Sequence, residues 1–271
     1  MHGCFQAVPP LPDNEDPSPV QTQNPMLSKS QVQLVQSLQQ KKFRQRYGMF
    51  AAAGQKVVGE LLNSSWPLDQ VFALEEWALA HEAQLSAKSV QAVVVSPKQL
   101  ERISFQDQPQ SVLVLARIPA NNAPIPSQGW ALALDGIRDP GNLGTLLRTA
   151  HWFGAAGVYL SPGCVDRFNP KVVQASMGSL FHLACKVLDP GEWPSDASQP
   201  LWGADAHGLD LRELDFPPNG ILVIGSESHG ISEEVGARLA QRCRIGGAEQ
   251  TESLNAAVAA GILLAKALNF A

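Results

Sequence analysis

Short apolar runs that alternate with helical segments are the feature that most constrains the fold of this 271-residue chain. In the second half of the chain these runs are Trp130–Leu134, Val158–Leu160, Leu201–Ala206 and Ile221–Ile224. They hold almost no charge, which is typical of strands that are buried on both faces. The helical segments between them supply the crossovers that parallel strands need. We therefore expect an α/β fold with a parallel sheet covered by helices.

A similar alternation in the first half predicts a smaller α/β unit. Ser28 is a suitable N-cap for one helix that continues to about Tyr47, with Val32, Val35 and Leu38 on its apolar face. The expected strands of this unit are Met49–Ala53, Val71–Leu74, Val90–Val95 and Ser111–Arg117.

Composition shifts along the chain divide it into four segments. Residues 1–27 are rich in proline, contain acidic but no basic residues, and are expected to form a flexible tail. Residues 28–118 form the first α/β unit, and residues 119–129, with three prolines, read as a linker. Residues 130–271 form the second unit.

The charge of the chain is unevenly distributed. With 25 acidic and 20 basic residues the net charge is −5, which on average argues against a nucleic-acid partner. Residues 27–59 nevertheless contain six basic residues and no acid, among them Lys41, Lys42, Arg44 and Arg46. This segment is either a solvated helix face or an element that contacts phosphates, with interleaved aromatic residues that could stack on bases.

Cysteine usage and hydropathy set the expected environment. The four cysteines lie far apart and form no C-x-x-C pair, so we expect neither a metal site nor disulfides. The first residues lack the pattern of a secretory signal, and no run of about 20 apolar residues occurs. We therefore expect a cytoplasmic protein that does not enter a membrane.

The first of three glycine-containing loops is the segment 135–150, which leaves a strand and opens a helix. Ligands of α/β proteins bind at such strand ends. Arg148 lies among apolar neighbours here and could be either a structural partner of an aspartate or a functional residue. A dinucleotide site is poorly supported, because the glycines do not follow G-x-G-x-x-G.

The second loop, Gly225–Gly230, follows the strand Ile221–Ile224 directly. Its serine and histidine suggest a hydrolase, but Ser226 stands where a nucleophile elbow around Ser228 would need glycine. What remains is a tight turn that presents one carboxylate, Glu227, between two glycines.

The third loop, Ile245–Asn255, opens the last helix, and Ser253 is a plausible N-cap for it. Each of the three loops is ambiguous when taken alone. Three such loops in this order, at one edge of one sheet, form a specific pattern.

The ordered motifs N-L-G-x-x-x-R (Asn142–Arg148), G-x-E-x-x-G (Gly225–Gly230) and S-L-N (Ser253–Asn255) resemble the SpoU (TrmH-like) RNA ribose 2′-O-methyltransferases of the SPOUT superfamily. The resemblance covers residues 130–271. The first unit is similar to the ribosomal-protein-like substrate-binding domain that precedes this domain in many members. The resemblance implies a deep trefoil knot, S-adenosylmethionine as cofactor, RNA as substrate, an active site at a homodimer interface, and no metal.

The resemblance also implies roles for individual residues. Arg148 would stand at the reacting hydroxyl, Asn142 and Glu227 would orient Arg148 or the RNA, and Ser253 and Asn255 would hold the third loop and contact substrate. The residues implied to line the cofactor site are Ala204, Gly225, Ile245 and Leu254. Those implied to contact RNA are Lys41, Lys42, Arg44 and Arg46.

Some positions depart from the family pattern. The third loop commonly begins Ile-Pro in the family but is Ile245-Gly246 here, and Glu249 stands where glycine is frequent. Gly54 follows two alanines where relatives often have Glu-Gly. The motif residues are all retained, which favours an active methyltransferase. The basic first domain favours ribosomal RNA (23S-type) as its substrate, with transfer RNA as the second candidate. The alternative is a catalytically silent RNA-binding or ribosome assembly factor with the same fold.

Overall fold

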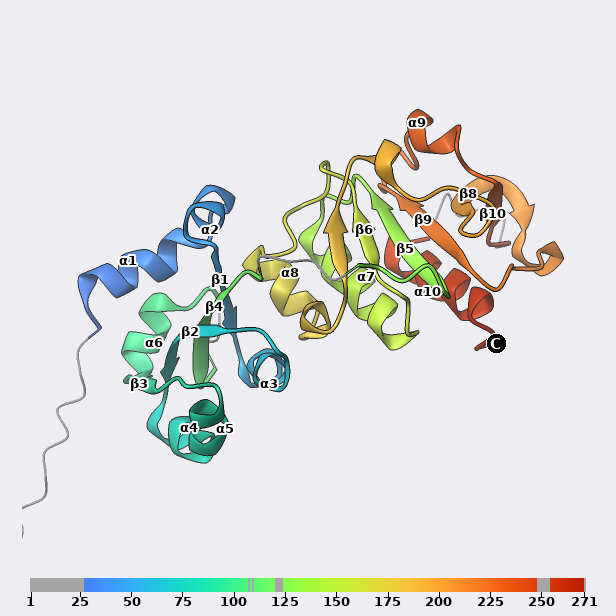
Figure 1. The fold of residues 1–271 in the computed structure, drawn as a ribbon. Helices are drawn as coiled ribbons and strands as arrows, with labels where there is room; N and C mark the ends of the chain where they lie inside the picture. Colours follow the sequence, from blue (N-terminus) through green and yellow to red (C-terminus); the bar gives the residue numbers. More distant parts are fainter. Residues whose placement is uncertain (1–26, 107, 109, 120–123, 248–253, 271) are drawn as a thin grey trace, which may run out of the picture.

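The chain forms two sheets, each flanked by helices, which lie side by side and meet at a helix of the second unit (Figure 1). The computed structural model describes residues 27–106, 108, 110–119, 124–247 and 254–270. Within these ranges no helix is long and apolar enough to cross a membrane.

The first unit is a four-stranded mixed sheet of order β1-β4-β2-β3. Strand β4 runs antiparallel to both β1 and β2, whereas β2 and β3 are parallel. Its strands are β1 (Met49–Ala53), β2 (Leu68–Ala73), β3 (Ala92–Val94) and β4 (Val112–Arg117). Its helices are α1 (Lys29–Ser37), α2 (Lys41–Tyr47), α3 (Gln55–Asn63), α4 (Glu75–Ala80), α5 (Glu82–Ala87) and α6 (Pro97–Ile103).

The prediction of one continuous helix up to Tyr47 is wrong, because the chain breaks between α1 and α2. Ser28 does cap α1, accepting a hydrogen bond from the Gln31 amide at 3.1 Å. At the break, the Arg44 guanidinium donates to the carbonyl oxygens of Leu38 and Gln39, at 2.7 and 2.8 Å. These bonds satisfy carbonyl groups that an interrupted helix leaves without partners.

The second unit is a six-stranded sheet of order β10-β8-β9-β5-β6-β7, and every neighbouring pair is parallel. The predicted parallel α/β sheet is therefore confirmed, although the short strand β7 was not expected. Its strands are β5 (Trp130–Asp135), β6 (Val158–Leu160), β7 (Cys185–Val187), β8 (Leu201–Asp210), β9 (Gly220–Gly225) and β10 (Gln241–Arg244). Its helices are α7 (Pro140–Trp152), α8 (Pro170–Ala175), α9 (Glu233–Gly236) and α10 (Ala256–Ala267), with 3-10 turns at Ser179–Phe181, Pro190–Glu192 and Leu211–Glu213.

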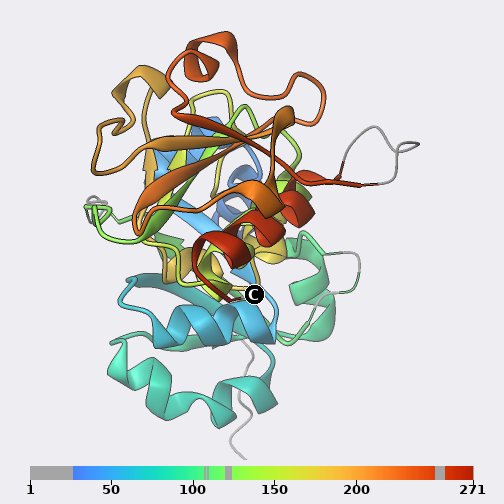
Figure 2. The same cartoon turned by 90° about the vertical axis from the view of Figure 1, so that its right-hand side faces the viewer.

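Both faces of this sheet are covered. Leu143 of α7 and Leu264 of α10 belong to the main core beneath one face. Trp193 and Val235, the latter on α9, pack on the opposite face. Figure 2 shows α10, drawn in red, at the front of the molecule in this view, next to the carboxyl terminus. The trefoil knot implied by the resemblance stays a prediction.

An aromatic cluster joins the two units. Phe50 of β1 and Trp66 come from the first unit, and Phe168 and Phe181 from the second. The ring centroids of Phe50 and Phe168 are 5.2 Å apart, and those of Trp66 and Phe181 are 5.4 Å apart in an edge-on arrangement. Such pairs add to the free energy gained by burying the rings, so the units are held by a packed apolar contact.

A buried ion pair lies beside this cluster. Arg44 of α2 is 2% exposed, and its guanidinium reaches the Asp166 carboxylate of the second unit at 2.6 Å. The expectation that Arg44 contacts RNA is therefore corrected, because its donors are directed to Asp166 and to the carbonyl groups at the end of α1. Arg44 connects the helix break to the domain contact.

Replacing Arg44 by Met should lower the free energy of unfolding by about 3 kcal/mol, because it leaves Asp166 without its buried cationic partner. Arg46→Met is the matched control, since Arg46 is exposed on the same helix, and it should cost less than about 0.5 kcal/mol. Urea unfolding measures both values. Equal costs for the two variants would show that the ion pair does not hold the domains together.

Candidate active site

Described residues of three loops that are far apart in sequence meet beyond the carboxyl ends of β5 and β9 in the parallel sheet. Strands β5 and β9 are neighbours with Asp135 opposite Gly225, so both chains leave the sheet at the same place. Helix α7 begins just after β5, and α10 packs against α7. The buried Asp135 carboxylate also accepts a hydrogen bond from the Ser232 amide at 2.8 Å, which ties the end of the second loop to β5.

One side chain from each loop joins a hydrogen-bonded cluster, here called the three-loop cluster: Asn142, Glu227 and Asn255. The Asn142 side-chain amide donates to Glu227 Oε1 at 2.6 Å. The Asn255 amide donates to Asn142 Oδ1 at 2.9 Å and to Glu227 Oε1 at 3.2 Å. The structure therefore brings together three of the five residues for which the resemblance implied catalytic roles.

Helix capping sets the orientation of Asn142 and Asn255. The Asp139 side chain caps α7 by accepting a hydrogen bond from the backbone amide of Asn142 at 2.7 Å. Pro140 follows at the first helical position. Asn255 caps α10, because its Oδ1 accepts from the Ala257 amide at 2.9 Å. With its oxygen occupied by the cap, Asn255 presents its amide nitrogen to the cluster. The prediction that Ser253 caps this helix is wrong, and Ser253 itself lies outside the described residues.

Glu227 is held by a tight turn. The backbone groups of Ser226 and Gly230 form two mutual hydrogen bonds, at 3.0 and 2.8 Å. A Cβ on Gly225 would lie 2.1 Å from the Gly230 carbonyl carbon, so only glycine fits at this strand end. The closely packed backbone presents Glu227 at the tip of the turn.

Arg148 is exposed and makes no hydrogen bond or ion pair with any residue that the structure describes. It lies six residues after Asn142 on α7, which corresponds to about 9 Å along the helix axis and about a third of a turn around it. The structure thus does not place Arg148 within the three-loop cluster. The alternative in which Arg148 is a structural partner of a nearby aspartate is therefore not observed among the described residues.

Of the four residues implied to line a cofactor site, Gly225 ends β9 and Ile245 directly follows β10, whereas Ala204 lies within β8 and Leu254 precedes α10. Gly203 of β8 pairs with Arg242 and Leu209 with Cys243, so the residues between them, Ala204 included, bulge from the sheet. Strand β9 ends at Gly225 beside β8, and Ile245 follows β10. Ala204 and Ile245 are partly buried against the main core, whereas Leu254 is exposed.

The departure at Gly246 has a local cause. A Cβ at this position would lie 2.9 Å from Asp210 Oδ2. Two side-chain hydrogen bonds from Arg212, both of 2.9 Å, hold the Asp210 carboxylate there. The Asp210–Arg212 pair occupies the space that a proline ring would need. Glu249, the other departure in this loop, lies outside the described residues.

Three of the four basic residues implied to contact RNA remain accessible on α2. Lys41, Lys42 and Arg46 are exposed, and the Lys42 ammonium lies 4.9 Å from the centroid of the Phe43 ring. Arg46 lies 5.7 Å from the centroid of the Tyr47 ring. Helix α2 therefore offers cations next to aromatic rings.

An exposed apolar face covers the outer side of α7 and α10. Trp152 of α7 is 79% exposed, and Val258 and Ile262 of α10 are also exposed. The helices pack side by side, since a Cβ on Gly261 would lie 3.7 Å from Thr149 Cγ2. Our sequence reasoning missed Trp152, although a tryptophan off the apolar stripe of an amphipathic helix is a recognisable signal.

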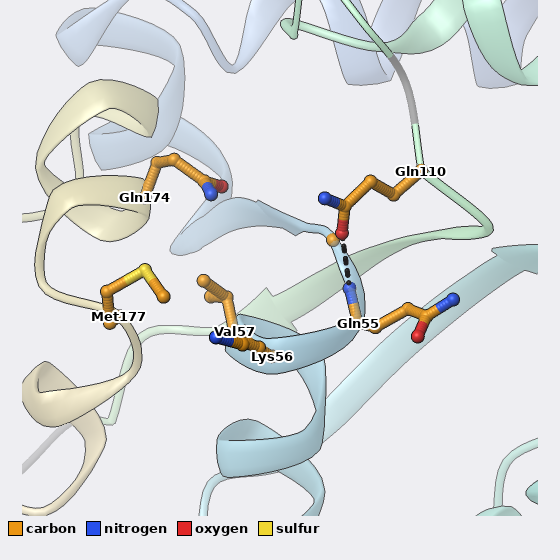
Figure 3. A pocket seen from close by; sticks show the side chains of 7 residues that line it. Gln55, Lys56, Val57, Gln110, Gln174 and Met177 are labelled. Carbon is orange, nitrogen blue, oxygen red and sulfur yellow. Dashed lines mark hydrogen bonds between the residues drawn. The ribbon is translucent and has the colours of Figure 1, made fainter.

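A small hollow of about 310 Å³ lies between α3 and α8 at the domain contact (Figure 3). Gln110 accepts a hydrogen bond from the Gln55 amide at 3.1 Å, and Lys56, Gln174 and Met177 complete much of its lining. No residue of the three loops lines this hollow, so it is separate from the three-loop cluster.

The described cysteines are poor nucleophiles. Burial raises the pKa of the Cys164 thiol, and it raises the pKa of Cys185 to about 11 and that of Cys243 to about 12. All three are therefore neutral thiols near pH 7, whereas the thiolate is the reactive form. Among the described residues, no group of three histidine, cysteine or acidic side chains could hold a metal ion.

The three-loop cluster predicts unequal costs for two Asn→Ala substitutions. Asn169 caps α8 by accepting a hydrogen bond from the Lys171 backbone amide, so Asn169→Ala should cost about 1 kcal/mol. Asn255→Ala removes a cap and two inter-loop bonds, so it should cost about 1 kcal/mol more. Thermal or urea unfolding gives both values, and equal costs would mean that the cluster does not tie the loops together.

Comparisons with known proteins agree with this arrangement. Residues 129–265 match the SpoU rRNA methylase family, and residues 29–114 match the MRM3-like substrate-binding domain. The chain is 30% identical to the 23S rRNA (uridine(2479)-2′-O)-methyltransferase of Streptomyces viridochromogenes, over 83% of this chain and 84% of that protein.

Solved structures show the same fold over both units. A structure from Porphyromonas gingivalis assigned to the TrmH family is 35% identical, has a TM-score of 0.77, and covers 91% of this chain and 100% of its own. The AdoMet-bound rRNA methyltransferase of Sinorhizobium meliloti is 29% identical and has a TM-score of 0.80. The match covers 88% of this chain and 94% of that chain. With the family match spanning half of its length and containing all three loops, this chain belongs to the SpoU rRNA methylase family.

Proposed function

We propose that this protein transfers a methyl group from S-adenosylmethionine to a ribose 2′-hydroxyl of RNA, with ribosomal RNA as the substrate. The observation that carries the proposal is the three-loop cluster, which joins one residue from each of the three family motifs. Relatives named as 23S rRNA 2′-O-methyltransferases and an AdoMet-bound structural neighbour support it.

The strand ends of the second unit suit the proposed cofactor. Gly225 leaves no room for a side chain, so a ligand there would meet backbone groups, and Ala204, Ile245 and Leu254 offer apolar surface for an adenine ring. When bound, S-adenosylmethionine supplies an activated methyl group on a sulfonium sulfur. The proposed reaction uses no metal, because the sulfonium already provides the leaving group.

Arg148 is the residue to which we assign contact with the reacting hydroxyl. An arginine side chain stays protonated in proteins, so it is a poor general base. Its fixed positive charge can instead stabilise the negative charge that develops on the 2′-oxygen. The proton then leaves to water or to a neighbouring RNA phosphate. Asn142, Glu227 and Asn255 act as positioning residues that hold the surrounding loops.

The RNA would be bound through both units. Lys41, Lys42 and Arg46 on α2 are exposed, and cations of this kind neutralise phosphates. The interdomain contact fixes α2 relative to the second unit through Arg44 and Asp166. RNA that contacts α2 is therefore positioned with respect to the three loops.

A homodimer would complete the active site. The exposed face of Trp152, Val258 and Ile262 is the type of surface that another protein chain covers. Arg148 lies on the same exposed side of α7 as Trp152, away from the three-loop cluster of its own chain. A second copy packed on this face would cover Trp152 and could bring Arg148 close to the partner's loops.

Arg148→Ala should reduce methyl transfer by about 100-fold or more, since it removes the charge that stabilises the developing alkoxide. Binding of S-adenosylmethionine, measured by calorimetry, should be unchanged. Arg102→Ala, which removes a charge on α6, is the control and should keep the wild-type rate. The assay follows radioactive methyl groups into ribosomal RNA. An undiminished rate in Arg148→Ala would contradict the assigned role, and no transfer by the wild-type protein would favour a silent RNA-binding factor.

Trp152→Glu should convert the dimer into a monomer, because a carboxylate at the centre of an apolar interface is costly to desolvate. Light scattering coupled to size exclusion gives the mass, and methyl transfer should fall together with dimerisation. Leu79→Glu, at an exposed position of α4, should stay dimeric. A wild-type protein that is monomeric at micromolar concentration would contradict the proposal.

A further inference from the structure

A second hollow lies at the junction of the two units, and Asn142, Glu227 and Asn255 are not among its lining residues. Its volume is about 520 Å³, and it is here called the junction pocket. Lys41 of α2 and Ile118 line it from the first unit and its connector. Leu160, Pro162 and Val187 line it from the carboxyl ends of β6 and β7.

Hydrogen bonds connect residues that line the junction pocket to the end of β5 and to the first loop of the site. Ser161 Oγ accepts from the Gly136 amide at 2.9 Å, and the Val165 amide donates to the Ile137 carbonyl at 2.8 Å. Cys164 Sγ donates to the Leu134 carbonyl at 3.2 Å. A molecule in the junction pocket would therefore touch residues that are hydrogen-bonded to β5 and to the loop that leads into α7 and Asn142.

The lining of the junction pocket combines apolar walls with positive charge. Its lining includes three basic residues, Lys41, Arg44 and Arg167, and one acidic residue, Asp166. Arg44 already neutralises Asp166. Arg167 donates to the Cys185 carbonyl and lies over the Phe168 ring. Lys41 is exposed at the rim and has no ion pair with a described residue.

Part of the apolar lining is exposed, namely Pro162 and Val187, whereas Leu160 and Phe168 are buried. Val187 lies on β7, the edge strand of the sheet, and is 52% exposed. An exposed apolar side chain and a lysine that line the same hollow match a flat ring that carries an anionic group. An unpaired nucleotide has this combination, because its base is largely apolar on both faces and its phosphate is negative.

We propose that the junction pocket seats an unpaired nucleotide of the substrate RNA that flanks the methylated residue. The base would lie against the exposed side chains of Pro162 and Val187, and its phosphate would face Lys41. This inference rests on the proposed function for the identity of the RNA. It adds a recognition site at which both domains contact one nucleotide. A base in a double helix could not enter, so the pocket would favour unpaired regions.

Two pairs of variants test the proposal. Lys41→Ala removes the cation, and Val187→Glu places a carboxylate on the apolar wall. Each should weaken binding of a fluorescent single-stranded oligouridine at least about fivefold at fixed salt. Lys98→Ala on α6 and Leu79→Glu on α4 are matched controls at exposed positions outside the pocket, and should stay within about twofold of wild type. Unfolding curves show whether each variant is folded.

A second probe separates pocket binding from general charge. For a blunt RNA duplex of the same length, Val187→Glu should bind as tightly as Leu79→Glu, because a paired base cannot reach the wall. Oligouridine affinity that is the same in Val187→Glu and Leu79→Glu would overturn the proposal. An equal loss for duplex and single strand would also overturn it, since it would indicate only charge repulsion. These binding measurements do not depend on methyl transfer, so a failure of the proposed reaction would be seen separately.

Discussion

The parallel pairing of β5 with β9 is the constraint on which the rest of the site depends. Asp135 and Gly225 lie opposite each other at the end of this pair, although 90 residues separate them in the chain. Their loops therefore leave the sheet together. The packing of α10 on α7 then brings the third loop to the same edge. A shift in the register of β5 and β9 would separate Asn142 from Glu227.

The contact between the two units also fixes the orientation of the first unit relative to the parallel sheet. Phe50 and Trp66 pack on Phe168 and Phe181, and Arg44 reaches Asp166 beside them. Arg44 also accounts for the break between α1 and α2, which starts a separate basic helix at the domain junction. One buried arginine thus affects both local helix structure and the orientation of the exposed cations of α2.

The parallel sheet and the three loops could be predicted because they depend on local patterns, namely apolar runs and glycine-containing strand ends. The break before α2 could not, because Asp166 is 122 residues away from Arg44 in the chain. For the same reason, Arg44 looked equivalent to its basic neighbours. The cap of α10 was misassigned to Ser253 because serine and asparagine are both good caps, and only the position of Asn142 and Glu227 favours Asn255.

The central claim is that this protein adds a methyl group to a ribose of ribosomal RNA. The most direct test is to map 2′-O-methyl groups across ribosomal RNA from cells with and without the protein. We predict that one ribose loses its 2′-O-methyl group in the deletion strain and regains it with the wild-type protein. Identical ribose maps in the two strains, or a change only in base methylation, would contradict the account.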